Sequence, residues 1–145
     1  DVGCGIAEMG IEIDRRNIGC QYVGVEINPL LQKINRLNLP NFKFYIYNLL
    51  SQKENHFLDG KYNIVMLMGA ESDHHMFCEI INNKINPEYV ICETHINRSH
   101  DLENIIKKLK KYTVSYKHRY TFTNNVNRFN YEPAYNRIMY ILKTQ

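Results

Sequence analysis

The hydrophobic and polar positions along the 145 residues follow two different repeats. Short, nearly unbroken apolar runs predict strands, and they stand at 21–27, 42–48, 62–68 and 89–95. Apolar residues at three- and four-residue spacing predict amphipathic helices, at 6–17, 29–39, 72–85 and 101–112. Pro29 suits the first turn of the second of these helices, and Asp101 is expected to cap the last. The pattern therefore predicts alternating strands and helices.

The strand-like runs are apolar at successive positions instead of every second one. This is typical of a parallel sheet with helices on both faces. The last two runs, 114–122 and 137–143, have no helical segment between them and predict an antiparallel hairpin. We expect residues 1–145 to form one α/β domain, a three-layer α/β/α sandwich with an antiparallel C-terminal strand.

Composition narrows the class of protein only slightly. With 44% hydrophobic and 23% charged residues, the chain fits one globular domain, and its net charge of +3 does not by itself indicate nucleic-acid binding. The cysteines at 4, 20, 78 and 92 form no CxxC pair, and three of them stand in apolar segments, which indicates reduced thiols. Neither a membrane-spanning run nor a signal peptide is visible, so we expect a soluble, cytoplasmic protein.

The first ten residues, DVGCGIAEMG, place two glycines ahead of a predicted helix. Glycine allows positive φ and close approach of a ligand, and a helix N-terminus offers unpaired N–H groups, so the stretch is suited to a nucleotide-like ligand. A turn without a ligand is the alternative. The strand that should lead into this turn would precede Asp1, so we expect a fragment whose first strand is truncated.

Glu26 supplies a second signal for the same kind of ligand. It ends the second strand 25 positions after Asp1, close to the offset of about 20 residues at which an acid in such folds binds ribose hydroxyls. The alternative is an ordinary capping acid in front of the helix that begins at Pro29.

Taken with these two signals, the sequence resembles the class I S-adenosylmethionine-dependent methyltransferases, which have a Rossmann-like fold. The resemblance is carried by DVGCG, GVEINP, YNLLS, YNIVMLMG, INPEYVIC and the closing RIMYILK. The opening turn lacks the third glycine of the dinucleotide dehydrogenases. The antiparallel last strand also separates the two classes.

The resemblance implies S-adenosylmethionine as cofactor and assigns roles to particular residues. It implies that the methionyl end lies against Asp1, Gly3 and Gly5, and that Glu26 binds the ribose. It implies that Ile27 packs on the adenine and that Asn48, followed by the apolar Leu49, binds the adenine amino group. It also implies that Met68 and Gly69 lie beside the transferred methyl group. An asparagine in place of the usual acid can both accept from and donate to adenine.

Methyl transfer needs an in-line acceptor and, for a hydroxyl, a base. The carboxyl ends of the fourth and fifth strands, where open α/β sheets bind substrate, offer Glu71, His74, His75 and His95 as catalytic candidates. A histidine can act as a base, and an acid–imidazole cluster can bind a divalent metal, although we expect none here. The alternative is that His74 and His75 only open a helix on its solvent side.

The acceptor is less clearly indicated. GVEINP, GAE and the ETH ending the fifth strand are similar to FkbM-type O-methyltransferases, so the expected reaction is O-methylation of a small molecule or sugar. Met66 or Met68 replaces the aspartate that this type has before GAE. An RNA 2′-O-methyltransferase and a catalytically silent binding subunit are the alternatives. Short linkers leave the sheet without a cap, so a partner chain or a missing domain is expected to complete the site.

Overall fold

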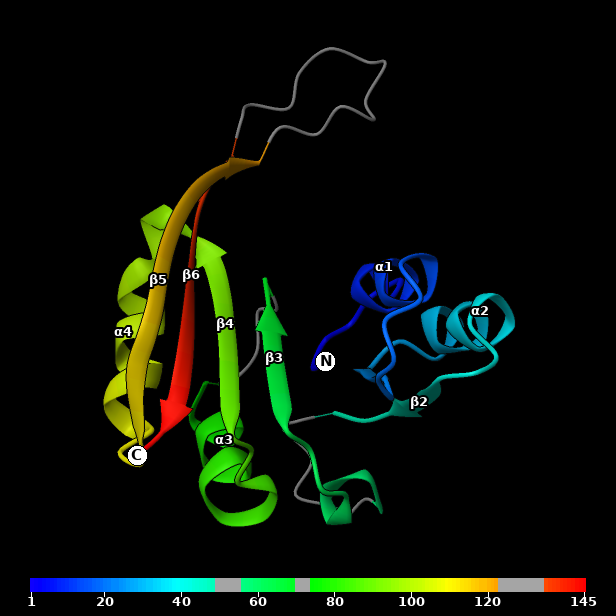
Figure 1. The fold of residues 1–145 in the computed structure, drawn as a ribbon, viewed down its shortest axis with the longest axis horizontal. Coiled ribbons are helices and arrows are strands. Elements are labelled where there is room, and N and C mark those ends of the chain that lie inside the picture. The colour runs from blue at the N-terminus through cyan, green and yellow to red at the C-terminus, as the bar shows by residue number, and fades with distance from the viewer. Residues whose placement is uncertain (49–55, 70–73, 123–134) are drawn as a thin grey trace.

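The computed structural model describes residues 1–48, 56–69, 74–122 and 135–145 (Figure 1). The strands are β1 (Val23–Glu26), β2 (Lys43–Ile46), β3 (Ile64–Met68), β4 (Tyr89–His95), β5 (Tyr112–Phe122) and β6 (Tyr135–Thr144). The helices are α1 (Glu8–Arg15), α2 (Pro29–Asn38), α3 (His74–Ile80) and α4 (Ser99–Lys108). Shorter helical segments are η1 (His56–Asp59), the π-helical η2 (Ile81–Ile85) and η3 (Ile96–Arg98).

Val2 joins the two groups of strands into one sheet. It forms parallel bridges to Val25 of β1 and to Leu67 of β3, and its N–H donates to the Met66 carbonyl at 2.9 Å. The order across the sheet is therefore β2-β1-Val2-β3-β4-β6-β5. β6 runs antiparallel to both of its neighbours, whereas the β1–β2 and β3–β4 pairs are parallel. The predicted α/β class and the antiparallel hairpin are confirmed.

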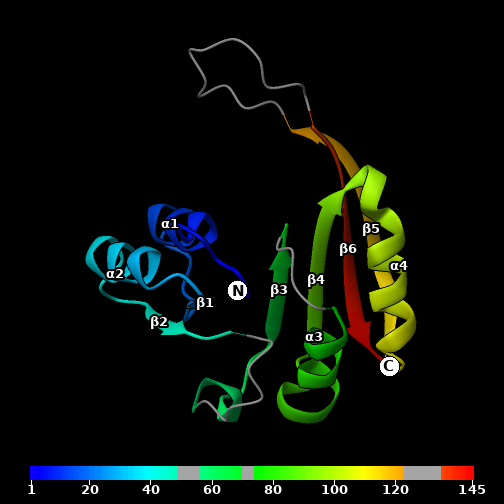
Figure 2. The ribbon, with the colours of Figure 1, turned by 180° about the vertical axis from the view of Figure 1, so that it is seen from behind.

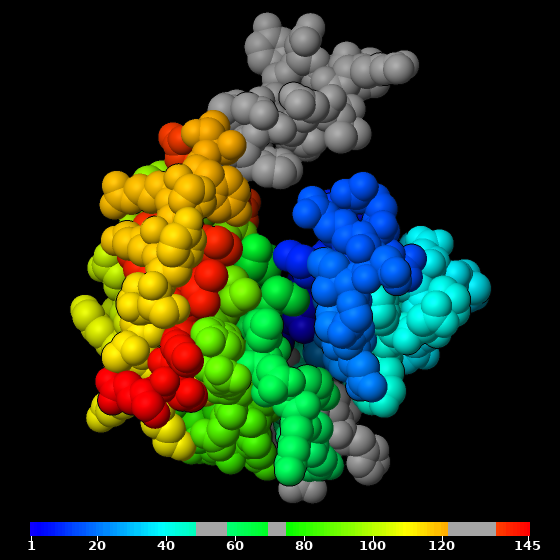
Figure 3. Space-filling view, in the orientation of Figure 1, coloured from blue at the N-terminus to red at the C-terminus, as the bar shows by residue number. Residues whose placement is uncertain are grey.

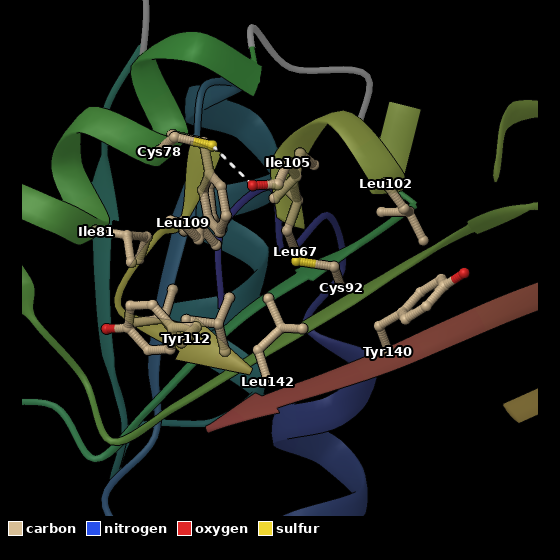
Figure 4. Close-up of a cluster of buried hydrophobic side chains, with 14 of the residues drawn as sticks. Leu67, Cys78, Ile81, Cys92, Leu102, Ile105, Leu109, Tyr112, Tyr140 and Leu142 are labelled. Carbon is tan, nitrogen blue, oxygen red and sulfur yellow. Dashed lines mark hydrogen bonds between the residues drawn. The ribbon is translucent and has the colours of Figure 1, made fainter. Parts of the chain in front are cut away.

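Helices α3 and α4 pack on one face of the larger group of strands. Figure 4 shows this apolar core, in which the Cys78 thiol lies 3.9 Å from the Ile105 carbonyl oxygen. The fully buried side chains include Phe77, Ile81, Leu102, Ile105, Leu109, Leu67, Val90, Ile138 and Leu142. A second cluster lies at the other end of the sheet, where α1 and α2 are found (Figure 2), and is made of Cys4, Ala7, Tyr22, Leu39 and Phe44.

The prediction that helices cover both faces of the sheet is wrong for β4, β6 and β5. On the face away from α4, no described helix packs over these strands, and Ile91 and Met139 stay half-buried while Tyr116 is 48% exposed. The antiparallel β5–β6 hairpin makes this possible, because antiparallel strands tolerate water on one side. One face of this part of the sheet is therefore open.

The structure also corrects both ends of the helix predicted at 101–112, since α4 runs from Ser99 to Lys108. α4 begins at Ser99, so Asp101 lies in its first turn and accepts from Arg98 Nε at 3.2 Å instead of capping the helix. The helix predicted at 72–85 is confirmed from His74 to Ile85, as α3 followed by the π-helical η2, and its first two residues lie outside the described residues. The differences in α4 concern helix ends, which local sequence determines least.

Helix α2 points polar side chains inward. Gln32 and Asn35 are both 1% exposed. Asn35 Nδ2 donates to the Gly5 carbonyl at 2.8 Å, Gln32 donates to a carbonyl of β2, and Arg36 Nη2 donates to the Phe44 carbonyl at 2.7 Å. The apolar stripe of the helix is exposed instead, through Leu30, Ile34 and Leu37. Hydrogen bonds thus attach α2 to the opening glycine turn and to strand β2.

Three of the four cysteines are buried, as the sequence predicts, and Cys20 is exposed. Burial raises the pKa of the Cys4 and Cys78 thiols to about 11 and that of Cys92 to about 12. These thiols are therefore protonated at neutral pH and poor nucleophiles. Among the residues described, no helix is long and apolar enough to span a membrane.

Candidate functional site

The opening turn owes its shape to left-handed residues at alternate positions. Gly3 has φ 68°, Gly5 has φ 52° and Ala7, the residue before α1, has φ 57°. The N–H groups of Gly3 and Cys4 both donate to the Val25 carbonyl, at 2.8 and 3.0 Å. Glycine meets the steric demand at the first two positions, and alanine accepts it at the third. The turn is thereby fixed at the carboxyl end of β1.

Glu26 is buried and joins the two turns at this end of the sheet. One carboxylate oxygen accepts from the Gly5 N–H at 2.9 Å, and the other accepts from the Asn28 N–H at 3.0 Å. Asn28, not Glu26, caps α2, since its side chain accepts from the Leu30 N–H at 2.9 Å. Glu26 is therefore not the residue that caps α2, and its binding of a ribose stays a prediction.

A cavity of about 290 Å³ lies between the glycine turn and the ends of the central strands (Figure 3). It faces α1 on one side and the ends of β3, β4, β5 and β6 on the other. The lining residues are Asp1, Gly3, Cys4, Glu8, Met9, Met68, Glu93, Tyr120 and Arg137. This is the edge at which open α/β sheets bind their ligands.

A partly buried ion pair forms the far wall of this cavity. Arg137 Nη2 donates to Glu93 Oε2 at 2.8 Å and Arg137 Nε donates to Oε1, so the contact is bidentate. The two side chains are 18% and 4% exposed. Burial lowers the pKa of Arg137 from its ordinary value, yet a guanidinium stays charged in proteins. His95 Nε2 lies 3.5 Å from Arg137 Nη1.

Gly69 packs against this ion pair. It has φ 68°, its N–H donates to the Glu93 carbonyl at 3.0 Å, and an added Cβ would lie 2.7 Å from Arg137 Nη2. The close packing explains why glycine ends the MLMG segment after β3. It also places the Gly69 backbone beside the cavity.

The sequence-predicted cofactor residues only partly meet at the cavity. Asp1, Gly3 and Met68 line it. Gly5 instead donates its N–H to Glu26. Ile27 follows Glu26 directly in the chain, and its side chain is 57% exposed. Asn48 follows β2 and is exposed, and Leu49 lies outside the described residues. The cofactor roles of these residues stay predictions.

The sequence-predicted catalytic residues are spread more widely. His95 ends β4 beside the ion pair. His74 begins α3, whereas the exposed His75 lies 3.7 Å from Glu79 and is not among the cavity-lining residues. Glu71 lies outside the described residues. Among the residues that are described, no three His, Cys, Asp or Glu side chains are grouped as a metal site would need.

Sequence reasoning missed Arg137 and Tyr120 as cavity residues. Both stand in runs predicted only as strands, and β-sheet register places them opposite each other. A signal was present, because Arg137 is a charged residue at the start of an apolar strand that runs antiparallel to one ending in Glu93 and His95. Opposite charges on adjacent strand ends could have indicated the pair.

No protein-family profile matches the sequence, and no curated protein is similar to it in sequence. Solved structures do share its fold. A TehB-like S-adenosylmethionine-dependent methyltransferase from Corynebacterium glutamicum matches with a TM-score of 0.70 and 11% identity, over 100% of this chain and 78% of that one. The methyltransferase domain of a bacterial Hen1 matches at 0.66 and 12%, over 99% and 88%.

A third structure extends the comparison to a much longer protein. A tRNA (uracil-54, C5)-methyltransferase from Pyrococcus abyssi, in complex with S-adenosyl-L-homocysteine, matches with a TM-score of 0.67 and 13% identity. The match covers 98% of this chain and 32% of that one. The chain thus has the Rossmann-like fold of the class I methyltransferases.

Gly69→Ala is expected to lower the free energy of unfolding by about 1–3 kcal/mol, because alanine is strained at positive φ and its Cβ would collide with Arg137. Urea unfolding measures the change. Gly19→Ala is the matched control, since no atom lies within 4 Å of its added Cβ. Equal stability of the two variants would contradict the packing that we describe.

Proposed function

We propose that the protein is a methyltransferase that uses S-adenosylmethionine to methylate a hydroxyl oxygen of its acceptor. The observation that carries the proposal is the Glu26–Gly5 hydrogen bond, which fixes a glycine turn beside a cavity at the carboxyl ends of parallel strands. The fold of solved S-adenosylmethionine-dependent methyltransferases supports the same reading.

The residues around the cavity fit this cofactor. Asp1 and Glu8 supply acidic side chains, which favour a ligand that carries a sulfonium and an ammonium group. Ile27 offers an exposed apolar side chain directly after Glu26, where adenine would pack. When bound, the cofactor supplies an activated methyl group. The chain has only to hold the acceptor in line with it.

The far wall of the cavity would hold the acceptor. Arg137 keeps donor N–H groups beyond those used by Glu93, since a guanidinium has five. Burial raises the pKa of Tyr120, so its hydroxyl stays protonated at neutral pH and can donate. An imidazole near neutral pH can take the proton of a reacting hydroxyl, and His95 is the candidate nearest to Arg137.

Titration calorimetry tests the cofactor. We expect S-adenosylmethionine and S-adenosylhomocysteine to bind with dissociation constants in the micromolar to millimolar range typical of metabolite sites. Absence of heat with both ligands, together with binding of NAD, would contradict the proposal. Binding without transfer of label from methyl-labelled cofactor to any fraction of a cell extract would favour the silent binding subunit.

A further inference from the structure

The charges of the chain are divided unequally along its length. Residues 107–145 contain nine of the 18 lysines and arginines but only one of the 15 acidic residues. The preceding 106 residues therefore carry an excess of acid, although the net charge of the whole chain is only +3. The basic segment comprises the end of α4 and the β5–β6 hairpin.

Strand β5 combines this charge with an aromatic row. It is the edge strand of the sheet, and Tyr116, His118 and Tyr120 stand at alternate positions on its open face. The ring centroids of Tyr116 and His118 are 5.9 Å apart, those of His118 and Tyr120 are 5.7 Å apart, and neighbouring rings are within 20° of parallel. Tyr116 and His118 are exposed.

The aromatic row leads to the cavity. Tyr120 is its last member, lines the cavity and lies opposite Arg137 in the sheet register. A chain lying along the row would therefore reach the wall of the cavity that we assign to the acceptor.

Basic side chains lie on both faces of the same edge strand and its neighbour. Lys117 and Arg119 alternate with the aromatic residues and point to the other side of the same edge strand, where both are exposed. Lys143 lies on the open face, with Nζ 5.4 Å from the centre of the Tyr89 ring. Lys117 and Arg119 are therefore on the face that α4 covers, with Lys117 Nζ 5.0 Å from the centre of the Tyr140 ring, and Lys143 is on the open face.

We propose that the exposed edge strand β5 binds single-stranded RNA, with bases on the aromatic row of its open face and phosphates along its basic edge, and directs one nucleotide of it into the cavity. Exposed aromatic rings beside basic side chains suit unpaired bases joined by phosphates, whereas an acidic protein would use the charge but not the rings. RNA also carries the 2′-hydroxyl that a hydroxyl-methylating site requires. The acceptor role rests on the function proposed above, but binding itself does not.

Fluorescence anisotropy with a labelled 12-nucleotide single-stranded RNA tests the surface. We expect Tyr116→Ala/His118→Ala to weaken binding about tenfold. We expect Lys117→Glu/Arg119→Glu to reduce the slope of log affinity against log salt by about 1.4. Lys33→Glu/Lys43→Glu makes the same change of charge on α2 and β2, outside the basic segment, and should leave the slope nearly unchanged.

Three results would overturn the RNA surface: equal affinity for a duplex, an equal effect of the two charge-reversal pairs, or full competition by poly-glutamate with no effect of the ring variants. Calorimetry with S-adenosylhomocysteine on the same variants keeps the two proposals apart. RNA binding without cofactor binding would contradict the function proposed above, and cofactor binding without RNA binding would contradict only this surface.

Discussion

Glu93→Ala is expected to destabilise the protein by about 1–3 kcal/mol, the cost of leaving a hydrogen-bonded group without its partner. The Arg137 guanidinium donates twice to this carboxylate, and the two side chains are 18% and 4% exposed, so water from the cavity that Arg137 lines can replace the lost partner only in part. Urea unfolding followed by circular dichroism measures the change.

Two further variants make this expectation specific. Arg137→Met should be as harmful as Glu93→Ala, whereas Glu93→Leu/Arg137→Met should regain much of the stability, because no charge is then left buried. Glu12→Ala breaks an exposed contact of 2.6 Å with Arg15 and should change stability far less. A small loss in Glu93→Ala, equal to that of Glu12→Ala, would contradict a buried pair.

Glu26→Ala should weaken two properties at once. It frees the N–H groups of Gly5 and Asn28, and hydrogen bonds to a charged group contribute about 1.5–3 kcal/mol each. We expect thermal stability to fall and affinity for S-adenosylhomocysteine to fall at least about tenfold. Differential scanning fluorimetry and calorimetry measure the two effects.

The conservative variant separates ribose binding from the support of the turn. Glu26→Gln keeps a carbonyl that can accept from one N–H but loses the charge. If stability fell in both variants while affinity held, Glu26 would be a residue of the fold alone. Unchanged stability in Glu26→Ala would contradict the hydrogen bonds to the two turns.

The elements with the strongest local patterns were predictable from the sequence. The apolar run at 89–95 matches β4 in both bounds, and Pro29 begins α2 as predicted. Asp101 was not a cap because Arg98 and η3 precede it, and this depends on how the chain leaves β4. Periodicity also says nothing about the buried amides of α2, since Gln32 and Asn35 are buried by hydrogen bonds and not by hydrophobicity.

The candidate site also has one part that the sequence predicts and one part that it does not. The glycine turn and Glu26 are close in sequence and follow a known offset, so local reasoning found them. The Glu93–Arg137 contact joins residues 44 positions apart and depends on the register of β6 against β4. No local pattern contains that register. The positive φ of Ala7 was also not predicted, because alanine carries no signal for a left-handed backbone.

The hydrogen bonds from α2 to β2 have a consequence for self-association. An edge strand with free carbonyl groups is a template on which another chain can add a strand and begin to aggregate. On β2, the carbonyl of Phe44 faces away from β1, and Arg36 occupies it. At the opposite edge, β5 has an irregularity in register between Val114 and Tyr116 and carries Lys117 and Arg119. The two ends of the sheet thus resist fibre-like stacking by different means, a side-chain hydrogen bond at one and irregular pairing with charge repulsion at the other.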